Sequence, residues 1–157
     1  MTIWVGSPAK CDASDVTAAA TLIKTGGAID AKLAVLEGRL RRSRTLAFCQ
    51  KEGQVVGVGC LKNPVPNYRE RVFTKAAVSM DRFQNAPELG YVTVDETMRG
   101  QGLAHQLVEA LVNILEEPCY ATTDDDTMKR MLGRSGFLKL GTEWTGQRGT
   151  LSLWTTH

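Results

Sequence analysis

The chain has 157 residues, of which 43% are hydrophobic and 23% charged, close to the average of globular proteins. This length is enough for one domain with a sizeable core, so we expect a single domain over residues 1–157. The formal net charge of +2 is too small to imply a nucleic-acid partner, and no apolar run is long enough to span a bilayer.

Cysteines and histidines are the side chains most often used for metal sites and disulfides. The cysteines show no CxxC spacing, and His105 and His157 complete no zinc pattern, so we expect no metal site. The N-terminus lacks the long apolar segment of a secretory signal, which favours a cytoplasmic protein. Four cysteines lie among apolar residues and are expected to be buried, reduced thiols: Cys11, Cys49, Cys60 and Cys119.

The first elements along the chain are predicted to be a strand and two helices. Residues 2–6 have strand composition. Asp12 and Ser14 are placed to cap a helix that Gly26 and Gly27 stop. The apolar face of this helix is Val16, Ala19, Ala20 and Ile23. A second helix is expected from about Asp30, and it ends in four arginines within residues 39–44. These arginines suit a solvated helix C-terminus, with anion binding as the alternative.

A hairpin and a loop are predicted next. Residues 45–51 and 54–61 are two apolar segments joined at Glu52–Gly53, which indicates a β-hairpin. Residues 62–70 are rich in turn formers and predict a surface loop near a substrate.

A strand over residues 88–94 and a long helix to about Glu116 follow. The predicted apolar face of this helix is Leu103, Leu107, Val108, Leu111, Val112, Ile114 and Leu115. The chain then continues with a strand over 119–123 and a helix that is capped by Asp124 or Asp125 and stopped by Gly136. A C-terminal hairpin comes last, with strands over 138–144 and 149–156. This order predicts an α/β fold, a mixed sheet with helices on its faces.

The turn between strand 88–94 and the long helix carries the strongest functional signal. A basic residue, Arg99, is followed by Gly100, Gly102 and Ala104 where the helix begins. N–H groups at a helix start have no carbonyl partner within the helix, and glycines let a diphosphate approach them. The helix dipole and Arg99 both favour negative charge there. The candidate donors are Gly100, Gln101, Gly102, Leu103 and Ala104. A purely structural turn is the alternative, because glycines are common at strand–helix junctions.

Two other phosphate-binding motifs do not fit this turn. A dinucleotide-binding GxGxxG loop would find its ribose-binding acid in Asp124, but His105 stands at its third glycine position. Its first glycine should also follow the strand directly, whereas five residues separate Val94 from Gly100. A Walker A loop fails because no Gly-Lys-Ser/Thr follows.

The segment RGQGLA, residues 99–104, resembles the Arg/Gln-x-x-Gly-x-Gly/Ala motif of the GNAT acetyltransferase superfamily. The segment GRSGF, residues 133–137, is similar to the Gly-Phe pair that closes the next helix in that family. The order of elements agrees over residues 1 to 155. The resemblance implies a GNAT-like acyltransferase fold, with a mostly antiparallel central sheet and helices on both faces.

The resemblance also implies roles for residues of the preceding strand. The backbone of Val92, Thr93 and Val94 would pair with the pantetheine arm of coenzyme A. Glu88 is similar to the glutamate that some members use as a base, and in a regular strand its side chain lies on the same side as Val92 and Val94. A solvated strand-end glutamate is the alternative. The Val92 N–H is the expected oxyanion donor.

One position departs from the family pattern. Many members carry a tyrosine five residues before the Phe of the Gly-Phe pair, where it protonates the departing thiolate, and this chain has Leu132 there. The acid is then another group, water, or not required.

We therefore expect an N-acetyltransferase that moves an acetyl group from acetyl-CoA to a primary amine. The alternative is a non-catalytic acyl-CoA-binding sensor of the same fold, which Leu132 favours. A second alternative keeps the enzyme but changes the acyl group, for example to succinyl. The sequence does not specify the acceptor. Because dimers are frequent in the family, the resemblance adds a second copy of the chain to the candidate partners.

Overall fold

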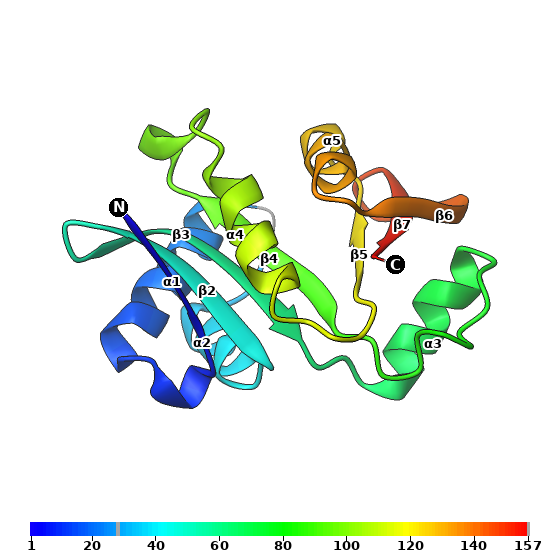
Figure 1. The fold of residues 1–157 in the computed structure, drawn as a ribbon, viewed down its shortest axis with the longest axis horizontal. Helices are drawn as coiled ribbons and strands as arrows, with labels where there is room; N and C mark the ends of the chain where they lie inside the picture. The colour runs from blue at the N-terminus through cyan, green and yellow to red at the C-terminus, as the bar shows by residue number, and fades with distance from the viewer. Residues whose placement is uncertain (28, 157) are drawn as a thin grey trace. The chain divides into compact units, whose positions relative to one another are not determined.

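The computed structural model describes residues 1–27 and 29–156 (Figure 1). His157, considered above as a metal ligand, lies outside them. The described elements are, in chain order, β1 (Thr2–Gly6), η1 (Pro8–Lys10), α1 (Ala13–Thr25), α2 (Leu33–Arg41), β2 (Thr45–Lys51), β3 (Gln54–Lys62), α3 (Pro66–Lys75), β4 (Glu88–Val94), η2 (Glu96–Met98), α4 (Leu103–Val112), β5 (Tyr120–Thr123), α5 (Asp126–Arg134), β6 (Leu138–Thr145) and β7 (Thr150–Thr155).

The strands form a mixed sheet in the order β1-β2-β3-β4-β5-β7-β6. Pairing is antiparallel for β1–β2, β2–β3, β5–β7 and β6–β7, and parallel for β4–β5. The predicted mostly antiparallel sheet is therefore confirmed. The chain divides into two compact units, the first comprising Met1–Asn63 and Leu89–Ile114, and the second Pro64–Glu88 and the residues from Leu115 onward. The single domain over residues 1–157 stays a prediction.

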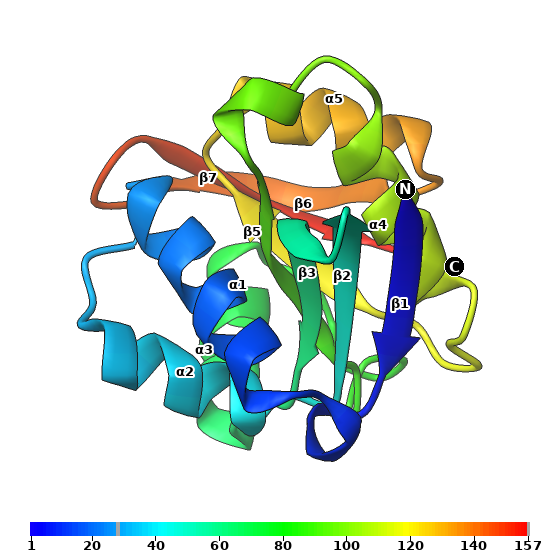
Figure 2. The ribbon, with the colours of Figure 1, turned by 90° about the vertical axis from the view of Figure 1, so that its left-hand side faces the viewer.

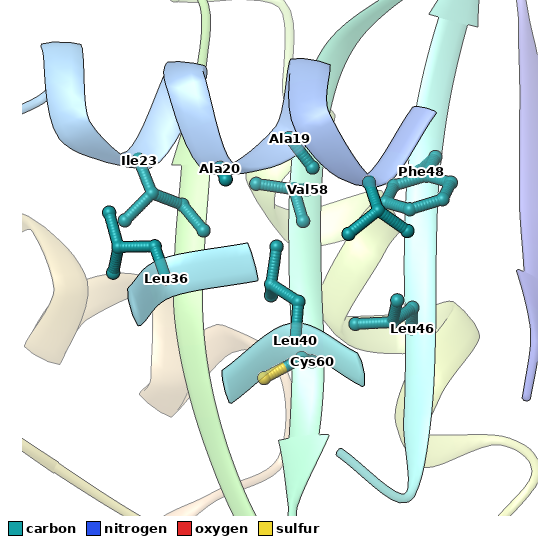
Figure 3. Packing of buried hydrophobic residues seen from close by; sticks show 10 residues of the cluster. Ala19, Ala20, Ile23, Leu36, Leu40, Leu46, Phe48, Val58 and Cys60 are labelled. Carbon is teal, nitrogen blue, oxygen red and sulfur yellow. The ribbon is translucent and has the colours of Figure 1, made fainter. Parts of the chain in front are cut away.

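One face of the strands of the first unit is covered by α1 and α2. Figure 3 shows Ala19, Ala20 and Ile23 of α1 and Leu36 and Leu40 of α2 in one apolar cluster with residues of the strands. The residues that they meet on the strands are Leu46, Phe48, Val58 and Cys60. Their burial removes apolar surface from water, which is worth about 1.5–3 kcal/mol for each large side chain.

The opposite face of the same strands is covered by α4 (Figure 2). Two glycines of β3 permit this close approach. A Cβ at Gly57 would lie 3.1 Å from Leu107 Cδ1, and one at Gly59 would lie 3.2 Å from Leu111 Cδ1. Since side chains alternate along a strand, Val58 faces α1 while its glycine neighbours face α4. This packing fixes where α4 begins relative to β4, and so positions the glycine turn.

The second unit has an aromatic core between α3 and its strands. The Phe73 ring lies 5.1 Å from the Phe83 ring and 5.3 Å, edge-on, from the Tyr120 ring, measured between centroids. Arg69 of α3 is buried, and its guanidinium donates to the carbonyl oxygens of Ala86 and Gln84 at 3.0 and 2.6 Å. These bonds tie α3 to the segment that leads into β4.

Most of the predicted elements are confirmed. The α1 face buries the four predicted residues, and the hairpin turn has positive φ at both Glu52 and Gly53, as a type I′ turn requires. Asp125 caps α5 by accepting from Met128 N at 3.2 Å. All four cysteines are free thiols, but Cys11 is only partly buried, unlike the other three.

The predicted surface loop over 62–70 is wrong in its second half, because α3 begins at Pro66. Proline is well suited to the first turn of a helix, where its missing N–H has no partner to lose. The α2 helix begins at Leu33 instead of about Asp30.

The long helix ends at Val112 instead of about Glu116. Glu116 and Glu117 would place two negative charges at a helix C-terminus, where the dipole disfavours them. Ile114, which was assigned to the buried face, is consequently 52% exposed.

Candidate functional site

The chain leaves β4 through a short, well-bonded turn. Asp95 caps η2: its Oδ1 accepts from Thr97 Oγ1 at 2.6 Å and from Thr97 N at 2.9 Å. These two hydrogen bonds, the side-chain one first, hold the pKa of Asp95 below its ordinary value. Asp95 N also donates to Val56 O at 2.8 Å. The turn is thereby fixed to β3 before the glycines are reached.

The two glycines of the turn adopt a left-handed backbone. Gly100 has φ 81° and Gly102 has φ 77°, values at which an L side chain is strained. An ideal Cβ at either position meets nothing within 4 Å, so no packing demand explains why these positions are glycine. The open space beside them is what the approach of a ligand to the backbone requires.

Helix α4 starts with backbone donors that have no partner within the helix. Its first intrahelical bond runs from Gln106 N to Gly102 O, so the N–H groups of Leu103 and Ala104 precede the ladder. The N-cap is Gly102, which has no side chain to accept from them. The start of α4 therefore presents backbone donors and the positive end of the helix dipole.

Arg99 is exposed beside this turn, and its Nε donates to Val94 O at 3.3 Å. The bond ties its side chain to the last residue of β4. Its positive charge is added to that of the helix dipole.

Tyr91, within strand β4, has a left-handed backbone with φ 54°. A left-handed conformation costs a non-glycine residue about 1–2 kcal/mol. The Tyr91 side chain has partners from two neighbouring elements: its hydroxyl accepts from Arg39 Nη1 of α2 at 3.4 Å, and Lys62 Nζ of β3 lies 4.0 Å from its ring centroid. The condition of a regular strand, under which Glu88 was expected on the same side as Val92 and Val94, is therefore not met at Tyr91, and the shared side stays a prediction.

Glu88, the first residue of β4, belongs to the second unit and is buried, at 5% exposure. The alternative of a solvated strand-end carboxylate is therefore excluded. Its Oε2 accepts from the Tyr68 hydroxyl of α3 at 3.1 Å. Its Cα pairs with that of Tyr120 on β5, the single β4–β5 register pair within the described residues.

The side chains of Leu132 and Cys119 are not suited to act as an acid or a nucleophile. Leu132 is fully buried in α5 and is part of the core. Burial raises the pKa of the Cys119 thiol to about 12, so the thiolate required of a nucleophile is not formed near neutral pH.

The predicted binding residues lie on consecutive elements of the chain. Val92, Thr93 and Val94 lead through η2 into the turn of residues 99–104, all within the first unit. Tyr68 was not predicted as a partner of Glu88. Pro66 could have indicated the start of the helix that carries Tyr68. The hydrogen bond from Tyr68 to Glu88, however, joins residues 20 apart in the sequence.

Comparison with known proteins defines the class and then the family. A family model described as "Acetyltransferase (GNAT) family" matches residues 23–137, which is most of the chain. The chain therefore belongs to the GNAT acetyltransferase family, whose members generally use an acyl-CoA cosubstrate. No curated protein matches this chain.

Three solved structures illustrate the shared fold. An acyl-CoA N-acyltransferase from Pseudomonas aeruginosa has TM-score 0.72 and 16% identity, with 99% of each chain covered. A ribosomal-protein-alanine N-acetyltransferase from Brucella melitensis has TM-score 0.70 and 20% identity, again with 99% of each chain covered. An aminoglycoside 6'-acetyltransferase type Ii has TM-score 0.70 and 13% identity, with 99% of this chain and 96% of that chain covered. These likenesses concern the fold.

The described residues contain neither a metal-binding cluster nor a membrane-spanning helix. No group of three or more His, Cys, Asp and Glu side chains is arranged to hold a metal ion. None of the helices in residues 1–27 and 29–156 is long and apolar enough to cross a membrane.

Proposed function

We propose that this chain is an N-acetyltransferase that transfers an acetyl group from acetyl-CoA to a primary amine by direct attack. The observation that carries the proposal is the glycine turn, with open space beside Gly100 and Gly102 and unpaired N–H groups at the start of α4. Two similar structures that accept different amines, a ribosomal protein and an aminoglycoside, support an N-acetyltransferase without indicating which acceptor is used.

In this proposal the coenzyme A diphosphate binds at the turn. The N–H groups of Gly100, Gln101, Gly102, Leu103 and Ala104 are the donors. The helix dipole contributes about half a positive charge, and Arg99 contributes a full one. The donors are fixed before binding because Asp95 and η2 hold the turn to β3. Little ordering is then needed when the ligand arrives.

The backbone of Val92, Thr93 and Val94 is proposed to pair with the pantetheine arm. The left-handed residue Tyr91 precedes this segment and turns the peptide groups that follow it. A strained backbone conformation persists only where surrounding contacts stabilise it, and such residues are often found at functional sites. The Val92 N–H is the proposed donor to the oxyanion that develops during transfer.

Bound acetyl-CoA supplies an activated acetyl thioester, and the protein must supply a neutral amine. An amine with pKa near 10.4 is only about one part in 2,500 neutral at pH 7, a deficit of about 4.6 kcal/mol. Glu88 is proposed to take the proton, directly or through water. Its burial and its bond from Tyr68 hold the carboxylate in one place.

No acid is assigned to the departing thiolate. Leu132 occupies the position of the family's tyrosine, and it is buried in the core. A thiol with pKa near 8.5 is a good leaving group, so water suffices to protonate it.

The same buried Leu132 favours a second candidate function, a non-catalytic acyl-CoA-binding module. Turnover separates the two candidates. A panel of primary amines is incubated with acetyl-CoA, and thiol release is followed. The enzyme releases one thiol per acetylated amine, whereas the module binds CoA esters with no release above the rate without protein. Parallel reactions with succinyl-CoA test the alternative acyl group.

A further inference from the structure

Tyr120 carries a polar atom without a visible partner. Its side chain is fully buried, and its hydroxyl makes no hydrogen bond within the described part of the chain. Buried hydroxyl groups nearly always have a partner, either from the protein or from an ordered water. The buried hydroxyl of Tyr120 therefore needs a partner that the described residues do not supply.

The neighbours of Tyr120 are the residues around the proposed base. Tyr120 and Glu88 are register partners on parallel strands, which lie about 4.8 Å apart, so their side chains leave the same face of the sheet. Tyr68 reaches the same carboxylate from α3. Burial first, and then the negative charge of Glu88 and the phenol of Tyr68, raise the pKa of Tyr120. The phenol stays neutral and acts as a donor.

The positive charge of Arg69 acts on Tyr120 but is already engaged in hydrogen bonds. Arg69 moves the pKa of Tyr120 in the opposite direction, but its guanidinium donates to the carbonyl oxygens of Ala86 and Gln84. These two hydrogen bonds hold the Arg69 guanidinium in place.

We propose that the Tyr120 hydroxyl and the Glu88 carboxylate share one buried water, which makes Tyr120 a positioning residue for Glu88. A buried water needs two to four polar partners, and the two side chains provide them. The carboxylate has about four acceptor sites. The Tyr68 hydroxyl donates to Oε2, and the proposed water donates to the same carboxylate.

This inference rests on the proposed function, because it gives Tyr120 its role through Glu88. During transfer the amine nitrogen bonds to the acetyl carbon as the thioester C–S bond breaks. The amine proton goes to Glu88, the thiolate takes a proton from water, and Tyr120 keeps its own. The strongly retained proton of Tyr120 makes it unsuited to protonate a thiolate. The residue orients the base and does not replace the acid.

The first test needs no turnover. A crystal structure of the whole chain is expected to show one water within about 2.6–3.2 Å of both Tyr120 Oη and a Glu88 oxygen. The isosteric variant Tyr120→Phe keeps the ring contact with Phe73 and should lose this water. A dry Tyr120 hydroxyl, or a direct bond from it to Glu88, overturns the inference.

The second test measures the role of the residue. Tyr120→Phe should lower kcat about tenfold, the equivalent of one hydrogen bond, and should move the acidic limb of kcat/KM upward by about half a pH unit. In the Glu88→Gln background the same change should alter kcat less than twofold. Equal losses in both backgrounds overturn the proposed route through Glu88.

Ser152→Ala is the matched control. Ser152 is also a fully buried hydroxyl of the second unit, but it has a partner, since its Oγ accepts from Trp154 Nε1 at 2.9 Å. The variant should lower Tm and leave the pH profile unchanged. If the parent protein acetylates no amine, the proposed function fails, while the crystal structures still decide whether Tyr120 and Glu88 share a water.

Discussion

The change Gly102→Glu is expected to remove acetyl-CoA binding while the protein stays folded. At φ 77° a side chain costs about 1–2 kcal/mol, and no atom lies within 4 Å of its Cβ to add a clash. For a chain of this size that strain lowers Tm by about 2–8 °C. The new carboxylate competes for the N–H groups at the start of α4 and repels a diphosphate.

The assay is the shift in Tm on addition of acetyl-CoA. Ligand at a hundred times its dissociation constant adds about 2.7 kcal/mol to the parent, or about 5–11 °C. Gly102→Glu should shift by less than about 1 °C under the same conditions.

Gly53→Glu is a closely matched control. Gly53 lies in the β2–β3 turn with φ 78°, and a Cβ there also meets nothing within 4 Å. This variant should show a similar loss of intrinsic Tm and the full ligand shift of the parent. A full ligand shift in Gly102→Glu would refute the placement of the diphosphate at this turn.

The remaining predictions concern chemistry and packing. Glu88→Gln should leave acetyl-CoA affinity nearly unchanged and slow transfer about a hundredfold, less as the pH approaches the pKa of the amine; equal slowing at every pH would indicate a positioning role. No tyrosine should act as an indispensable acid, so each of three variants should lose less than about a hundredfold in kcat with normal cofactor binding: Tyr68→Phe, Tyr91→Phe and Tyr120→Phe. Gly141→Ala should lower stability by about 3 kcal/mol or more in urea unfolding, because φ is 68° and the new Cβ overlaps Ala76 O. Gly133→Ala, within α5 and 3.9 Å from the nearest side-chain atom, should instead raise stability by about 0.5–1 kcal/mol, and a loss there would contradict the packing described.

Local patterns in the sequence predicted the elements that local physics determines. The apolar spacing of α1, the Glu52–Gly53 turn and the cap at Asp125 depend on residues within a few positions of one another. The glycine turn belongs to this group, since both the strand before it and the helix after it are visible in the sequence. The fold followed from the order of these elements together with the family resemblance.

Features that depend on distant residues could not be predicted in the same way. The left-handed backbone of Tyr91 is accompanied by contacts from Arg39 and Lys62, which come from two other elements. The hydrogen bond between Tyr68 and Glu88 depends on α3. The prolines and the asparagine of this segment are typical of turns, so a loop was predicted there. In each case the sequence shows the residues but not the tertiary contact that gives them a role.

Acetyl transfer itself tests the central claim most directly. Purified protein is mixed with acetyl-CoA and a panel of primary amines, and the released thiol and the acetylated amine are both quantified at steady state. We expect the two products in a one-to-one ratio, at a rate that Gly102→Glu abolishes and Gly53→Glu preserves. Saturable binding of acetyl-CoA with no product from any amine would contradict the proposed enzyme and favour the acyl-CoA-binding module.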